Sequence, residues 1–130
     1  MLGNFQQSHL RIELAAPAET IGKSLLCPTQ MYQWLWPQNF SSGLPEQLSS
    51  GLTFTSWVGP IAIQHQVDVA DSNCLRLFLS QGIDGYHEWY WGEGWVQSRL
   101  EGISLLPLNL AQTFSLLRLR QFLTASNRCA

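Results

Sequence analysis

The feature that most constrains the fold is a series of short alternating segments between residues 52 and 105, with turns roughly every ten residues. Residues 61–69 alternate most clearly, with apolar side chains at 61, 63, 67 and 69 and polar ones at 64, 66 and 68. Such alternation indicates a half-buried strand. Antiparallel strands can be joined by tight turns, whereas parallel strands need long crossovers. The series therefore predicts an antiparallel meander.

The remaining strands of the meander follow the same logic. We predict strands over 52–58, 61–69, 75–80, 86–91 and 95–105, with turns at 59–60, 70–73, 83–85 and 92–94. The turn at 83–85 is predicted because Asp-Gly readily adopts positive φ. Residues 9–15 alternate as well and predict a strand before the meander, and 38–50 read as a short irregular strand with a loop.

Three helical segments flank these strands. Pro17 and Pro28 each suit the first turn of a helix, which predicts two short helices before residue 37. From Pro107 to Ala125 nothing breaks a helix, so a long C-terminal helix is predicted. That helix carries two apolar stripes on nearly opposite sides, Leu110, Ala111, Phe114 and Leu117 on one and Leu108, Leu119, Phe122 and Leu123 on the other. Apolar residues on both sides predict that both sides are covered.

Length and composition point to a single domain over residues 1–130 with a substantial core. Charged residues make up only 12% of the chain, against a usual share of about 25%. Six tryptophans in so short a chain suggest a large core, a cavity wall or an interface. The low charge also suggests that part of the surface is hidden against a partner, and a homodimer is the partner we expect.

The same composition disfavours several classes of protein. A net charge of −2 with seven scattered Lys and Arg residues gives no basic patch for nucleic acid. No apolar run approaches the roughly 18 residues of a transmembrane helix, and the first residues do not resemble a secretory signal. The cysteines at 27, 74 and 129 form neither a disulfide framework nor a zinc spacing. We expect a cytoplasmic protein without a metal or cofactor.

The element order and one local stretch resemble a known superfamily. The stretch is residues 84–100, Asp-Gly-Tyr-His-Glu-Trp-Tyr-Trp-Gly-Glu-Gly-Trp-Val-Gln-Ser-Arg-Leu. It resembles the penultimate hairpin of the START-like (SRPBCC) superfamily, which includes polyketide cyclases, pollen-allergen proteins and lipid-transfer domains. Members often carry Gly-Thr where this chain has Gly94-Trp95. The resemblance implies an α+β helix-grip fold, in which a curled antiparallel sheet of about six to seven strands wraps a long C-terminal helix. It also implies a cavity for a hydrophobic ligand between the sheet and that helix.

His65 is the leading candidate for a functional side chain. By strand parity it lies with Ile63 and Val67, so it is predicted to face the core or the cavity. There it could orient a polar ligand group or act as a general base. A buried histidine that merely bonds a neighbour is the more frequent case.

The aromatic strand offers a second set of candidates. His87 shares one face with Trp89 and Trp91, and Glu88 shares the other with two tyrosines. The sequence does not say which face lines the cavity, and aromatic packing explains either arrangement without function. The catalytic candidates are therefore His65, His87 and Glu88. The predicted ligand-binding residues are His65, Ile63, Val67, Leu77, Trp89, Trp91, Leu110, Phe114 and Leu117.

Three functions remain open at this point. The first, which we favour, is binding or transport of a hydrophobic small molecule such as a lipid or polyketide, because apolar lining is visible and catalytic motifs are not. The second is an enzyme of the polyketide cyclase or dehydratase type, which requires convergent polar groups in the cavity. The third is a protein-interaction module whose cavity is filled by its own side chains.

Overall fold

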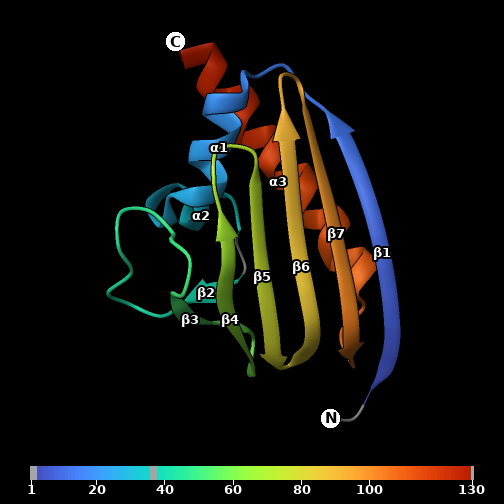
Figure 1. Ribbon diagram of the computed structural model, residues 1–130. Helices are drawn as coiled ribbons and strands as arrows, with labels where there is room; N and C mark the ends of the chain where they lie inside the picture. The colour runs from blue at the N-terminus through green and yellow to red at the C-terminus, as the bar shows by residue number, and fades with distance from the viewer. Residues whose placement is uncertain (1–2, 36–37, 130) are drawn as a thin grey trace.

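The computed structural model describes residues 3–35 and 38–129, and Figure 1 shows a curled sheet with its helices on one side. Seven antiparallel strands form one unclosed sheet in the order β1-β7-β6-β5-β4-β3-β2. The predicted α+β helix-grip architecture is confirmed. Its strands are β1 (Asn4–Glu13), β2 (Asn39–Phe40), β3 (Thr53–Val58), β4 (Ile61–Ala70), β5 (Cys74–Gln81), β6 (Ile83–Gly92) and β7 (Trp95–Ser104).

The helices are α1 (Ala18–Leu26), α2 (Pro28–Trp34) and α3 (Leu108–Cys129). Pro17 is the N-cap of α1 and Pro28 the first residue of α2, where a missing N–H costs nothing. The long α3 runs behind β6, β7 and β1, and the two short helices pack beside its C-terminal part (Figure 1). Within the described ranges, no helix combines the length and apolarity that a membrane span requires.

Only one of the two apolar stripes of α3 is buried. Leu108, Leu116, Leu119 and Leu123 are at most 2% exposed and pack into the core. The other stripe stays accessible, with Leu110, Phe114 and Leu117 between 43% and 67% exposed. Within the monomer one side of this helix is therefore covered, and a cover over the other side stays a prediction. The sheet covers one side, and the other borders the cavity described below.

The turn before β6 lies two residues earlier than predicted. Gln81 adopts a φ of 70° and Gly82 follows it, so β6 already begins at Ile83. Gly85 instead sits inside the strand, directly opposite Gly102 of β7. A Cβ atom at Gly85 would overlap the carbonyl oxygen of Glu101. This glycine pair therefore permits a close approach of two backbones, and it makes no turn.

Replacing Gly85 by Ala is expected to lower the free energy of unfolding by about 3 kcal/mol or more, because β6 and β7 must separate to admit the methyl group. Gly43→Ala is the matched control. Its Cβ would meet nothing within 4 Å, so only the φ of 78° opposes it, at a cost of about 1 kcal/mol. Urea unfolding followed by tryptophan fluorescence measures both. Equal costs would show that the close approach at Gly85 is unimportant.

Candidate functional site: a cavity between the sheet and the last helix

A cavity of about 490 Å³ lies between the concave face of the sheet and α3. Its walls are mainly apolar and come from β3 to β7, from residues 35 and 38 after α2, from the segment before α3 and from α3 itself. The apolar lining residues are Leu35, Val58, Ile63, Leu79, Ile83, Leu100, Leu106, Pro107, Leu108, Leu110, Ala111 and Phe114. Because Leu110 and Phe114 are both lining and solvent-exposed, they mark the mouth of this outer cavity. The volume lies in the usual range for small-molecule sites.

A smaller inner pocket of about 60 Å³ continues toward α1 and α2. It shares five residues with the outer cavity: Leu35, Gln38, His65, His87 and Ser115. The rest of its wall is aromatic and aliphatic, including Phe54, Trp34 and Trp89. The polar groups of the site are thus concentrated where the two spaces meet, and the apolar surface extends outward from there.

His65 faces inward, as strand parity predicts. It is 7% exposed, lines both spaces and stacks on Phe54 with ring centroids 4.7 Å apart. Its Nε2 lies 2.7 Å from the hydroxyl of Ser56, and that hydroxyl accepts a hydrogen bond from Gln38 Nε2 at 2.6 Å. Burial lowers the pKa of His65 to about 4, so the imidazole is neutral at pH 7.

His87 occupies an equivalent position on β6. Its Nε2 lies 2.8 Å from the hydroxyl of Ser98 on β7, which accepts a hydrogen bond from Gln112 Nε2 at 2.9 Å. Burial, and secondly the positive charge that His65 would carry, lower the pKa of His87 to about 3. The cavity therefore contains two neutral imidazoles, each at the end of a chain that runs from a glutamine amide through a serine hydroxyl.

Gln112 was not among the site residues predicted from the sequence. It is 2% exposed, and its amide nitrogen donates to the carbonyls of Ser8 and Ser98 at 3.2 and 3.0 Å. Its Oε1 accepts a hydrogen bond from the Ser8 hydroxyl. The signal was present, since residue 112 falls one turn after Leu108 on the stripe that is buried. A polar residue on a buried stripe indicates a hydrogen-bonded role.

The structure brings only some of the predicted ligand-binding residues to the cavity. Ile63, His65, Leu110 and Phe114 line the outer cavity, and Leu77 and Trp89 line the inner pocket with His65. Three others lie elsewhere. Val67 and Trp91 are at most 2% exposed and belong to the closed core, and Leu117 is 43% exposed on α3 beyond the lining residues. Strand parity and helix periodicity predicted which face each residue lies on. They could not predict how far along each strand or helix the cavity extends.

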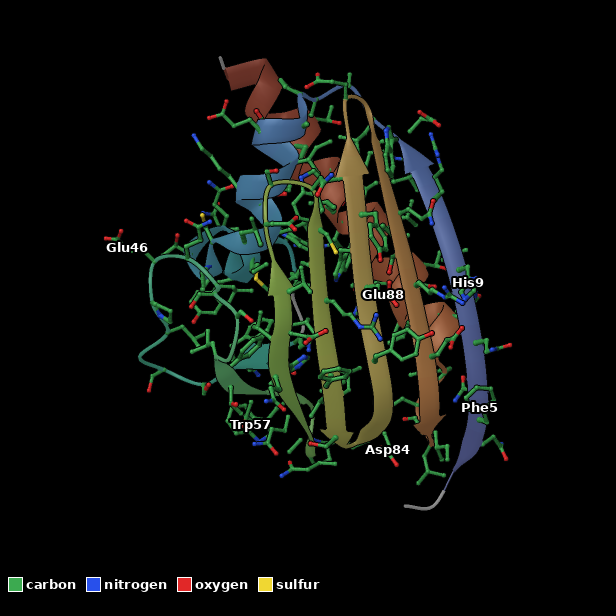
Figure 2. All side chains as sticks on the ribbon, viewed as in Figure 1. Phe5, His9, Glu46, Trp57, Asp84 and Glu88 are labelled. Atoms are coloured by element: carbon green, nitrogen blue, oxygen red, sulfur yellow. The ribbon has the colours of Figure 1, made fainter. Side chains whose placement is uncertain are left out.

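Glu88 does not belong to the cavity. Because His87 and Trp89 face the helices, Glu88 faces the opposite, convex side of the sheet. Figure 2 views the sheet from that side and labels Glu88 on β6. It accepts a hydrogen bond from the hydroxyl of Tyr90 at 2.6 Å and pairs with Arg76 at 3.6 Å. The bond to Glu88 raises the pKa of Tyr90 to about 12. The three predicted catalytic candidates are therefore divided between two faces of the sheet.

No family model matches this sequence, and no curated protein sequence does either. Solved structures do match the fold. Protein CV1439 from Chromobacterium violaceum is 18% identical with a TM-score of 0.71, over 88% of this chain and 95% of that one. CalU16 from Micromonospora echinospora is 12% identical with a TM-score of 0.66, over 91% and 76%. DynU16, from the dynemicin biosynthetic locus, is 14% identical with a TM-score of 0.68, over 92% of this chain but 48% of that one. At these identities the similarity establishes the fold.

Proposed function

We propose that this protein binds an apolar small molecule in the cavity between its sheet and α3. The observation that supports this most strongly is the cavity itself. It has a volume of about 490 Å³, its walls are mainly apolar, and its mouth is bordered by Leu110 and Phe114. Transfer of an apolar guest from water to such walls is favourable by roughly 25 cal/mol for each Å² buried. The open space also disfavours a module whose cavity is filled by its own side chains.

Cyclase or dehydratase chemistry is the second candidate, and the polar cluster at His65 and His87 is the observation in its favour. DynU16 comes from a biosynthetic locus, and this agrees with that reading. Against it stand the pKa values of about 4 and 3. A base is most effective when its pKa lies near the working pH, and these imidazoles are too weakly basic for proton abstraction near pH 7. Within the described residues, neither space is lined by a carboxylate. Binding therefore accounts for the site better than catalysis.

Native mass spectrometry of freshly purified protein, followed by denaturing extraction, is the direct test. We expect one bound hydrophobic molecule for each protein chain. A cavity-blocking variant then locates it. Ser115 lines both spaces, so Ser115→Trp is expected to lower the affinity for the uncharged dye Nile red at least about tenfold, which corresponds to 1.4 kcal/mol.

Gln121→Trp is the matched control for this variant, because residue 121 is an exposed position of the same helix and is not part of either lining. Its affinity for Nile red should equal that of the unmodified protein. If both variants bind the dye normally and remain folded, the dye binds elsewhere and the proposed function is wrong. The expected homodimer stays a separate prediction, which sedimentation of the same samples would check.

A further inference from the structure

The two glutamine–serine–histidine chains determine where the protons of the site lie. Gln112 Nε2 faces two carbonyl oxygens, so it must be the amide NH₂ and cannot accept a hydrogen bond from the Ser98 hydroxyl. The hydrogen of that hydroxyl then has one recorded acceptor among the described residues, the Nε2 of His87. A neutral imidazole that accepts at Nε2 carries its proton on Nδ1. His87 therefore presents an Nδ1–H donor.

His65 has a similar arrangement, in which the hydrogen bonds of the described residues give the Gln38 amide nitrogen one partner, the Ser56 hydroxyl. Gln38 donates to the Ser56 hydroxyl, and the hydroxyl donates to His65 Nε2, so His65 also carries its proton on Nδ1. That Nδ1 is buried and has no hydrogen-bond partner in the structure. An unpaired buried donor costs about 1–3 kcal/mol, which makes it an unusual feature that calls for a partner. It lies on a side chain that lines both the outer cavity and the inner pocket.

His87 differs from His65 in being accessible from the cavity. Its side chain lies on the concave face and lines both spaces, and part of its surface remains accessible to solvent. No hydrogen bond from the described residues reaches its Nδ1, and this atom is not among the sealed unpaired ones. Its N–H is thus free to meet a guest in the cavity.

The lining also limits the charge of that guest. Among the described residues, no Asp, Glu, Lys or Arg lines either space. Burying a carboxylate or an ammonium without an opposite charge is very unfavourable, whereas an uncharged oxygen needs only a hydrogen bond. The accessible donor belongs to an imidazole that is neutral near pH 7, because burial lowers the pKa of His87 to about 3.

Building on the proposed function, we propose that the ligand is an uncharged carbonyl compound, whose oxygen accepts a hydrogen bond from His87 Nδ1–H at the polar end of the cavity. The apolar part of the ligand extends toward Leu110 and Phe114 at the mouth. A ketone, aldehyde, ester or quinone satisfies this description, and a fatty acid does not.

Displacement of Nile red at pH 7.5 by 2-decanone, 1-decene and decanoate tests the proposal with chains of similar length. We expect the ketone to bind at least tenfold more tightly than the alkene or the carboxylate. In His87→Phe the ketone should lose that advantage while the alkene binds as before. A ketone no better than the alkene, or a carboxylate equal to the ketone, would overturn the proposal but leave apolar binding intact. If the dye and all three compounds fail to bind, the proposed function itself is wrong.

A second measurement does not depend on a substituted histidine. The ¹⁵N chemical shifts of the imidazole nitrogens in the unmodified protein distinguish the two tautomers. We expect a protonated Nδ1 and an unprotonated Nε2 for both His65 and His87. A proton on Nε2 of His87 would overturn the proposal. Ser98→Ala removes the hydroxyl that selects the tautomer, and it should reduce the preference for the ketone while the affinity for the alkene is retained.

Discussion

Acidification from pH 7 to pH 4 is expected to remove a large part of the free energy of unfolding of this protein. The pKa values of His65 and His87 are lowered by burial to about 4 and about 3, whereas an imidazole in the unfolded chain titrates near 6.5. Between those values the unfolded chain binds more protons than the native state. Stability is therefore complete above pH 6.5 and falls as the pH drops toward 4.

The size of this effect follows from the same linkage. Each buried histidine lowers the free energy of unfolding by about 1.4 kcal/mol for each pH unit across its range. Two such groups over two units amount to several kcal/mol, against the 5–15 kcal/mol that is typical of whole domains. Urea unfolding at pH 7.5, 6.5, 5.5 and 4.5, followed by the fluorescence of the six tryptophans, measures the slope.

The double variant His65→Gln, His87→Asn provides the control. It should be less stable than the unmodified protein at pH 7.5, but its stability should change little between pH 6.5 and 5, where carboxyl groups have hardly begun to titrate. A variant with the same pH slope as the unmodified protein would show that other groups cause the acid lability.

Replacing Gln112 by Leu is expected to lower the free energy of unfolding by about 2–4 kcal/mol, although the new side chain has a similar size. The amide fixes α3 to two strands, since it bonds to Ser8 on β1 and to Ser98 on β7. Leucine would leave two buried serine hydroxyls and two carbonyl oxygens without this partner, and each unsatisfied polar group costs about 1–3 kcal/mol.

Gln121→Leu is the corresponding control on the exposed side of the same helix, and it should change stability by no more than about 0.5 kcal/mol. Urea midpoints for the two variants give the comparison. Similar midpoints would mean that water replaces the amide at position 112 and that the helix is held mainly by its apolar stripe.

The sheet and the helices could be predicted because their signals are local. Alternation over 61–69 gave a half-buried strand with His65 inward, and the two prolines gave the helix starts. Parity could not choose between the faces of β6, because both carry aromatic residues and only the position of the helices distinguishes them. The turn was misplaced because Asp84-Gly85 has a turn-like sequence, while Gln81 adopts the positive φ.

The site could be predicted only in part, for a different reason. A cavity is space that side chains leave empty, and its limits depend on how far apart α3 and the sheet lie. Val67 and Trp91 have the same apolar character as Ile63 and Leu77, yet they fill the core. The hydrogen-bonded chains escaped prediction because serine and glutamine are common on surfaces. Their meaning appears only when β3 lies beside β4 and β7 beside β6.

The pairing of β1 with β7 has a consequence for the order in which the chain can fold on a ribosome. Strands β3 to β7 are joined by short turns and can pair as soon as each follows the last, but β1 must wait until residues 95–104 have been made. The wall that α3 will cover is made before α3 itself. Until α3, which begins at Leu108, has been synthesised, the apolar concave face of the nascent sheet is exposed to water and to chaperones.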